Sequence, residues 1–119
     1  MTSRERLQRT CKYYEAHYGM STAFKTEAEF LSIVTAFLET AGALVIRQAY
    51  ATKKGISDLI CCYKGRFLAL ELKDDTGAPS QQQKKFISNV LSHEGQAAVV
   101  DQLLQISMLL TEILKECGE

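Results

Sequence analysis

The chain has 119 residues, 46% of them hydrophobic, which is enough for one globular domain with its own core. Fourteen basic and fourteen acidic side chains cancel, which excludes a protein whose entire surface attracts nucleic acid through net positive charge. The sequence has no signal-peptide core and no apolar run of membrane length, so we expect a cytoplasmic protein with reduced cysteines.

The first part of the chain favours two helices followed by a strand. Apolar and aromatic residues recur at helical spacing over residues 3–18, and Gly19 follows as a stop. Thr26 and Glu29 fit a capping box that opens a second helix, which runs to Gly42. Residues 43–51 then have the pattern of a strand.

The second part favours two more strands, a helix, a strand and a last helix. Residues 57–63 and 66–73 predict two strands joined by a tight turn at Lys64-Gly65. Ser80 and Gln83 form a second capping box, and the helix they open runs to Gly95. A short strand at 97–100 and a last helix, which Asp101 is expected to cap and which runs to about Lys115, complete a mixed α/β or α+β sandwich.

The last helix is apolar on nearly all sides. One apolar stripe of this helix is expected to face the core, and three further apolar residues lie outside that stripe. They indicate that the helix has a second packing partner. These residues are Leu104, Met108 and Leu109.

The predicted hairpin brings two acidic residues face to face. If Lys64-Gly65 form the turn, Tyr63 pairs with Arg66 and, further along, Asp58 pairs with Glu71. Like charges directly opposed across two strands destabilise a sheet, so one carboxyl must be protonated or a cation must lie between them. Oxygen ligands of this kind suit Mg²⁺ or Mn²⁺.

A lysine and a further carboxylate are expected beside this pair. Lys73 lies two residues beyond Glu71 on the same strand face. The helix starting near Thr26 is expected to cover this face, and at 100° per residue Glu27 falls within its apolar stripe. Glu29 points away and fits the capping box better, although helix starts are uncertain by a residue or two.

These residues together resemble the VRR-NUC family of the PD-(D/E)XK nuclease superfamily. The resemblance covers residues 26–105 and rests on a helix with Glu27, a strand, G-I-S-D ending at Asp58, E-L-K from Glu71 to Lys73, and P-S-Q-Q-Q ending at Gln83. It implies a restriction-endonuclease-like core, with a small mixed sheet in the order α-β-β-β-α-β. Residues 1–119 would be one nuclease domain, with an N-terminal helical appendage at 1–20 and a C-terminal helix at 101–116.

The resemblance also implies roles for the site residues. Asp58, Glu71 and the Leu72 carbonyl would bind Mg²⁺ or Mn²⁺, with Glu27 binding directly or through water. Lys73 would orient or deprotonate the attacking water. Gln83 matches the family glutamine best, although it is equally suited to the capping box and Gln81 is a rival.

One feature departs from the family pattern. Arginines are expected after the last core strand, but Asp101 and Gln102 follow Val100 here. Another basic residue would have to supply the phosphate contact that these arginines make.

DNA is the expected substrate. Lys53 and Lys54 precede Asp58, and Lys84 and Lys85 follow Gln83, so both pairs are candidates for phosphate contacts. This chain resembles the small members of the family, which implies a homodimer that cuts branched DNA such as Holliday junctions. We expect dimerisation through one or both terminal helices. The alternatives are a less selective nickase or flap endonuclease, and a nuclease fold that binds DNA without cutting it.

Overall fold

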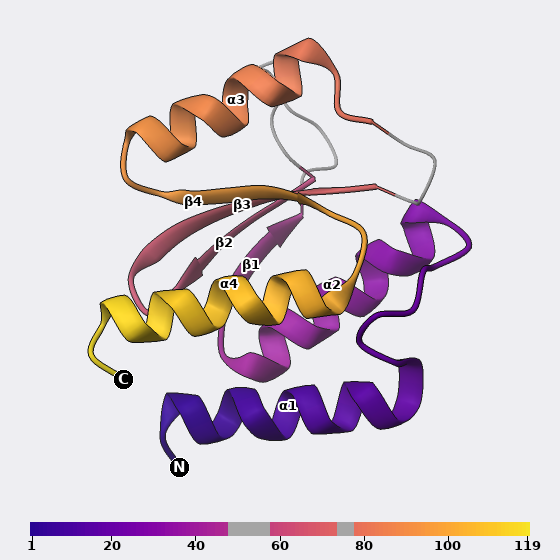
Figure 1. Cartoon of the computed structure of the whole chain (residues 1–119), viewed down its shortest axis with the longest axis vertical. Helices are drawn as coiled ribbons and strands as arrows, with labels where there is room; N and C mark the ends of the chain where they lie inside the picture. Colours follow the sequence, from indigo (N-terminus) through magenta and orange to yellow (C-terminus); the bar gives the residue numbers. More distant parts are fainter. Residues whose placement is uncertain (48–57, 74–77) are drawn as a thin grey trace.

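The computed structural model describes residues 1–47, 58–73 and 78–119, which together form a mixed α/β fold, as predicted (Figure 1). Residues 48–51 of the first predicted strand, and Lys53 and Lys54, lie outside the described residues. The described elements are α1 (Ser3–Tyr18), α2 (Glu27–Ala41), β1 (Leu44–Arg47), β2 (Leu59–Tyr63), β3 (Arg66–Leu72), α3 (Gln81–Ser92), β4 (Gln96–Val100) and α4 (Leu103–Glu116).

The four described strands form one sheet in the order β1-β2-β3-β4. β2 is antiparallel to both of its neighbours, β1 and β3, and β4 runs parallel to β3. A parallel pair needs a crossover connection, and α3 supplies it. β1 and β4 are therefore the two edges of the sheet among the described residues.

The β2–β3 hairpin has the predicted register. Lys64 and Gly65 both have positive φ, at 53° and 78°, which is the requirement of a two-residue type I′ turn. Tyr63 pairs with Arg66, and the ladder continues to Leu59 opposite Leu70. The turn and the register that the sequence predicted here are confirmed.

The main core lies between the sheet and the helices α2 and α4. Alternate residues of β3 point into it, and these are Leu68, Leu70 and Leu72, all at most 1% exposed. The other face of the sheet is covered by α3, where Ala69 packs with Val90 and Ala97 in a smaller cluster. Figure 1 shows α3 alone above the sheet and the remaining helices below it.

One predicted packing relation was wrong. The helix at 26–42 was expected to cover the sheet face that carries Asp58 and Glu71, but α2 packs on the opposite face, with Phe30 and Phe37 in the main core. The periodicity of apolar residues identifies which side of a helix is buried. It does not identify which of two sheet faces receives that side.

The terminal helices complete the core. α1 forms an outer layer below α2 and α4 in Figure 1, and its Arg6 Nε donates to the Thr40 carbonyl at the end of α2, at 2.7 Å. Asp101 was predicted to cap the last helix, which was wrong. The helix begins two residues later, and the backbone N–H groups of Asp101 and Gln102 both donate to Gln105 Oε1. None of the described helices is long and apolar enough to cross a membrane.

Candidate active site

Glu71 is a buried carboxylate with one satisfied and one unsatisfied oxygen. It lies near the end of β3 and is 1% exposed. Its Oε1 accepts a hydrogen bond from Gln83 Nε2 at 2.7 Å and lies 3.2 Å from Lys73 Nζ. Its Oε2 is buried and has no hydrogen-bond partner among the described residues. Such an oxygen is available to a ligand that brings positive charge.

Asp58 lies opposite Glu71 at the open end of the hairpin. It directly precedes β2, and its Oδ2 accepts a hydrogen bond from the Leu72 backbone N–H at 2.9 Å. Counted from the two-residue turn, positions 58 and 71 form a non-hydrogen-bonded pair, in which side chains approach most closely. The backbone of the hairpin thus brings the two carboxylates together.

The pKa of Glu71 is raised from 4.5 to about 7. Burial is the larger cause, because it disfavours the charged form, and the negative charge of Asp58 adds to it. The hydrogen bond and charge of Lys73 act in the opposite direction but do not compensate. The sequence left two ways to relieve the repulsion between Asp58 and Glu71, a protonated carboxyl or a bound cation. The raised pKa of Glu71 gives the first of these a physical basis.

For Lys73, in contrast to Glu71, the neighbouring charges outweigh the effect of burial on the pKa. Its side chain is 17% exposed, and partial burial by itself lowers the pKa of an ammonium group. The pKa of Lys73 is nevertheless raised, because Glu71 accepts a hydrogen bond from it and the charges of Glu71, Glu27 and Asp58 favour the cation. Lys73 is therefore an ammonium group when only carboxylates surround it.

Gln83 has both of the roles that the sequence presented as alternatives. Its Oε1 accepts the backbone N–H of Ser80 at 2.8 Å, which is one half of the capping box that opens α3. Its Nε2 donates to Glu71. A backbone N–H can only donate, so the contact with Ser80 fixes which end of the amide reaches Glu71. Gln81, the rival, is exposed.

Glu27 reaches the site by a route other than the predicted one. It is exposed rather than buried in the apolar stripe, and it lines a small pocket of about 100 Å³ with Asp58 and Leu72. The first turn of α2 therefore borders the site although α2 packs on the opposite sheet face. Glu29 gives its backbone N–H to Thr26 Oγ1 at 3.1 Å, and no reciprocal side-chain bond completes that capping box.

The residues present fit a hard divalent cation held mainly by two carboxylates. The described residues contain no preformed group of three or more acidic, cysteine or histidine ligands. Asp58 and Glu71, with the unpartnered Glu71 Oε2, supply oxygen ligands, and Leu72 directs its N–H, and so its carbonyl, toward the strand end at Asp58. Mg²⁺ commonly binds through one or two carboxylates and takes its remaining ligands from water and phosphate.

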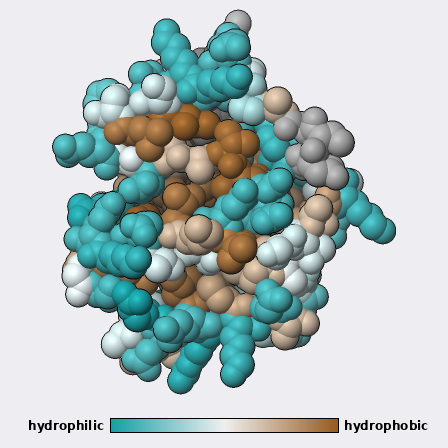
Figure 2. Space-filling model, in the orientation of Figure 1, coloured by the Kyte–Doolittle hydropathy of each residue, from teal (hydrophilic) through white to brown (hydrophobic). Residues whose placement is uncertain are grey.

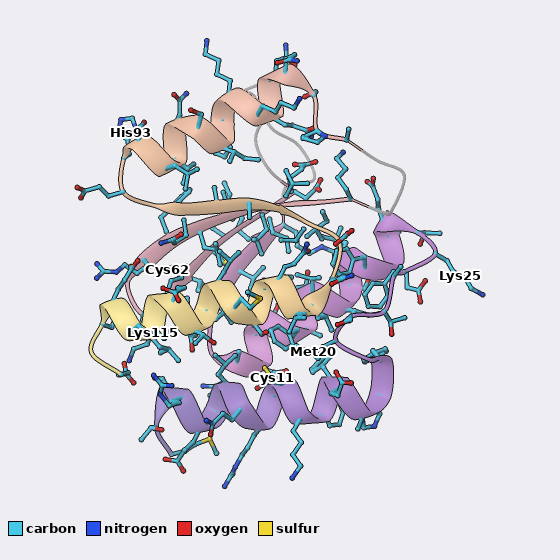
Figure 3. The ribbon with its side chains drawn as sticks, in the orientation of Figure 1. Cys11, Met20, Lys25, Cys62, His93 and Lys115 are labelled. Atoms are coloured by element: carbon cyan, nitrogen blue, oxygen red, sulfur yellow. The ribbon has the colours of Figure 1, made fainter. Side chains whose placement is uncertain are left out.

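Several basic residues surround this end of the molecule. Lys84 and Lys85 are exposed in the turn of α3 that carries Gln83. Sequence reasoning missed Lys25, which is exposed two residues before Glu27 and points away from the protein in Figure 3. Its position two residues before Glu27, a residue that the sequence had already singled out, was the available signal. The predicted phosphate contacts Lys53 and Lys54 lie outside the described residues.

Comparison with known proteins gives one informative match. A solved structure described as a VRR_NUC domain matches this chain with a TM-score of 0.50 and 19% sequence identity, over 93% of this chain and 97% of that chain. No family model matches the sequence, and no curated protein does. The predicted resemblance is confirmed at the level of the fold: the chain has the fold of a VRR_NUC domain.

Proposed function

We propose that this protein is a Mg²⁺- or Mn²⁺-dependent endonuclease of the VRR-NUC family, within the PD-(D/E)XK superfamily, that hydrolyses phosphodiester bonds in DNA. The observation that carries the proposal is the buried Glu71, which faces Asp58, touches Lys73 and has one oxygen without a partner. The fold shared with a VRR_NUC domain supports it.

In the proposed mechanism, the hairpin supplies the metal ligands and their orientation. Asp58, Glu71 and the Leu72 carbonyl would hold the cation, and Glu27 would complete the set through water or directly. A divalent cation, when bound, neutralises charge that develops on the phosphate and offsets the carboxylate charge around Lys73. Gln83 holds Glu71 Oε1, which leaves Oε2 to face the metal position.

Lys73 acts on the nucleophile. The water oxygen forms a bond to phosphorus, and the bond to the leaving sugar oxygen breaks. Lys73 accepts the proton that the water loses, or orients the water while that proton passes to solvent, and the leaving sugar oxygen takes up a proton from solvent. The lysine can accept a proton only after the negative field that raises its pKa has been offset. Histidine has no part in this scheme.

We infer that the substrate is branched DNA, such as a Holliday junction, bound by two copies of the chain. Lys84 and Lys85, and with them Lys53 and Lys54, are the proposed phosphate contacts, and Lys25 adds a further cation. Exposed apolar side chains on α4, such as Met108, support the proposal that the terminal helices take part in dimerisation. We place the protein in the cytoplasm, where its free cysteines stay reduced.

Cleavage of labelled four-way junctions, flaps and linear duplexes, each with Mg²⁺, Mn²⁺, Ca²⁺ or chelator, tests the proposal. We expect cutting of the junction with Mg²⁺ or Mn²⁺, and a loss of at least about two orders of magnitude in Asp58→Asn and Glu71→Gln. Lys73→Met should abolish cutting while leaving metal binding measurable. Glu29→Gln is a matched control, because it removes an acidic side chain from the same turn as Glu27 and should retain activity.

The other outcomes identify the alternatives. Equal cutting of flaps and duplexes would make the protein a less selective nickase or flap endonuclease. Binding of DNA by the wild type without cutting under any of the metals would make it a non-cleaving DNA-binding module. Unchanged metal-dependent cutting by Glu71→Gln would refute the assigned site.

A further inference from the structure

A cavity of about 440 Å³ lies between α3 and β3. Its volume is within the roughly 300–1,000 Å³ that small-molecule sites occupy. Figure 3 shows His93, one of its lining residues, at the C-terminal end of α3. The described residues that line it are Phe67, Phe86, Asn89, Val90, His93 and Gly95. The cavity therefore joins two phenyl rings with an amide and an imidazole, and the candidate active site uses none of these groups.

The cavity borders a hydrophobic layer beneath α3. Figure 2 shows hydrophobic surface between α3 and β4, with hydrophilic residues above and below it. Phe86 and Val90 belong to this layer, because they pack with Ala69 and Ala97 in the smaller core cluster. The apolar wall of the cavity is therefore held in place by the fold.

Phe67 offers an accessible ring at the other wall. Its side chain is 44% exposed, on a part of the sheet face that α3 leaves open. A Cβ at Gly95 would lie 2.8 Å from Val90 Cγ1 and 3.4 Å from Phe67 Cδ1. Gly95 does not have the positive φ that favours glycine, so its missing side chain has a packing role. It leaves room for the Phe67 ring, which rests against the backbone and remains open to solvent.

The polar groups of the cavity can contact the edge of a ligand. His93 Nδ1 lies 2.7 Å from the Asn89 backbone carbonyl oxygen. A carbonyl can only accept, so Nδ1 carries the proton of this hydrogen bond and Nε2 is the ring nitrogen left for a ligand. The exposed side chain of Asn89 supplies both a donor and an acceptor.

The charges near the cavity favour a ligand that carries phosphate. None of the described lining residues is acidic. Glu94 lies between His93 and Gly95 in the sequence, but it is exposed and does not line the cavity. Lys85 is exposed one helical turn before Asn89, on the same side of α3. A flat neutral ring in the cavity, with an attached phosphate near Lys85, would match this arrangement.

Two elements lead from the candidate active site to the cavity. On β3, Phe67 lies four residues before Glu71 on the same strand face, a separation of roughly 13 Å. On α3, Gln83 donates to Glu71, and Phe86 lies one turn further along the helix. Successive nucleotides of a stacked strand advance about 3.4 Å, so the separation corresponds to about four stacked nucleotides, or fewer extended ones.

We propose that this cavity binds an unpaired base of the DNA substrate, within about four nucleotides of the bond that is cut. The base stacks on Phe67, and its edge faces Asn89 and His93. The proposal rests on the proposed function and adds a feature of the substrate to it. A paired base has its edge occupied by its partner and its faces covered by neighbours, so only a base outside the stack can enter. A branch point, where stacking is interrupted, supplies such a base.

An apolar side chain of a partner protein is the competing occupant. It would fit the two phenyl rings but would make no use of Asn89 and His93. A base is favoured because the cavity lies on the sheet face that carries Glu71 and beside a helix side that carries Lys85. The two occupants differ in one requirement: a base needs an aromatic ring to stack on, whereas an apolar side chain accepts any apolar surface.

Fluorescence anisotropy with the full chain tests the proposal, with Ca²⁺ in place of Mg²⁺ and again in chelator. The probes are a duplex with a short single-stranded gap, the same gap with abasic sugars, and a fully paired duplex. We expect the wild type to bind the gap with bases about 5- to 150-fold more tightly than the abasic gap, the range for one base stacked on an aromatic ring. The fully paired duplex should bind like the abasic gap.

Variants of Phe67 separate stacking from apolar contact. Phe67→Leu should lose the preference for bases over abasic sugars, and Phe67→Tyr, which keeps the aromatic ring, should retain it. Leu44→Ala is the matched control, because Leu44 is an apolar residue on the same sheet face and is 68% exposed. It should retain the preference. Thermal unfolding of each variant checks that it folds.

A photochemical cross-link locates the base without any substitution. The gap carries 5-iodouracil, the complex with the wild type is irradiated, and mass spectrometry identifies the attached residue. We expect the cross-link on Phe67 or Phe86. A cross-link confined to other residues would overturn the proposal, even if Phe67→Leu failed to fold.

The remaining contrary results are distinct. Equal affinity of the wild type for the gap with bases and the abasic gap overturns the proposal. So does a Phe67→Leu variant that keeps the wild-type preference, a result that would fit a partner's apolar side chain instead. The proposed function fails separately, through absence of cutting with Mg²⁺ or Mn²⁺, and the affinities measured here do not depend on cutting.

Discussion

Glu71 keeps its proton to a higher pH than an exposed glutamate, because burial and the charge of Asp58 both disfavour the carboxylate. Its pKa is about 7 in the folded protein and near 4.5 when unfolded. Between these values the unfolded chain has released a proton that the folded chain retains. The free energy of unfolding must therefore fall as pH rises through this interval in metal-free buffer.

Glu71→Gln should remove this pH dependence. The amide keeps the size and hydrogen-bonding capacity of the carboxyl but cannot ionise. At pH values above the folded pKa, in chelator, we expect the variant to be more stable than wild type by roughly 1–3 kcal/mol. Near pH 4.5, where the wild-type carboxyl is protonated in the folded state, the two should be equally stable. Urea denaturation at both pH values measures this, and a less stable variant at high pH would contradict it.

Variants of Gln83 and Ser80 distinguish the capping of α3 from the orientation of Glu71 in the site. Gln83→Glu retains an acceptor for the Ser80 N–H but replaces the donor to Glu71 with a like charge. We expect an intact helix and a metal affinity whose pH midpoint moves upward. Ser80→Ala should do the reverse, lowering the free energy of unfolding by about 1 kcal/mol while leaving Mn²⁺ affinity nearly unchanged. Calorimetric titration with Mn²⁺ and urea denaturation distinguish the two.

The β2–β3 hairpin depends on a turn that few residues adopt. Gly65 has a φ of 78°, and a side chain there would contact nothing within 4 Å. The cost of Gly65→Ala is therefore purely conformational, about 1–2 kcal/mol, and Gly65→Asn should cost less because asparagine tolerates this conformation. Thermal unfolding of both variants checks the order. Equal stability of all three proteins would show that the core leucines alone hold the register.

The hairpin was predictable from the sequence because its information is local. The length of the turn and the alternation of side chains together determine that Asp58 faces Glu71, and no knowledge of distant contacts is needed. The double role of Gln83 was not predictable in the same way. Its contact with Glu71 depends on where the crossover places the first turn of α3, which the spacing of residues does not determine.

The position of Glu27 shows the same limit. The helical wheel described its neighbours on α2, but the packing of α2 against the sheet depends on contacts between segments far apart in sequence. Glu27 borders Asp58 because the helix starts at the edge of the site. The residue was therefore identified for a reason that the structure does not support.

For the molecule as a whole, a net charge of zero means that any affinity for DNA must come from local groups of basic residues. Replacing Lys84 and Lys85 together by glutamine should weaken binding of a catalytically inactive variant to all DNA shapes alike. The slope of log affinity against log salt should become shallower by about 1–2. Fluorescence anisotropy over a salt series measures both effects. Replacement of Lys12 and Lys115, which lie on other helices, is the control and should leave the slope unchanged.

The short turn at Lys64-Gly65 also has a consequence for the speed of folding. A hairpin closed by two residues can form within about 1–10 μs, so Asp58 and Glu71 meet early, before α3 and its crossover are in place. Their mutual repulsion would then raise the free energy of the folding transition state as well as that of the native state. We expect the refolding rate to increase at acidic pH or with Mg²⁺, and the unfolding rate to respond less. The metal that the finished site would use would thus also help to assemble it.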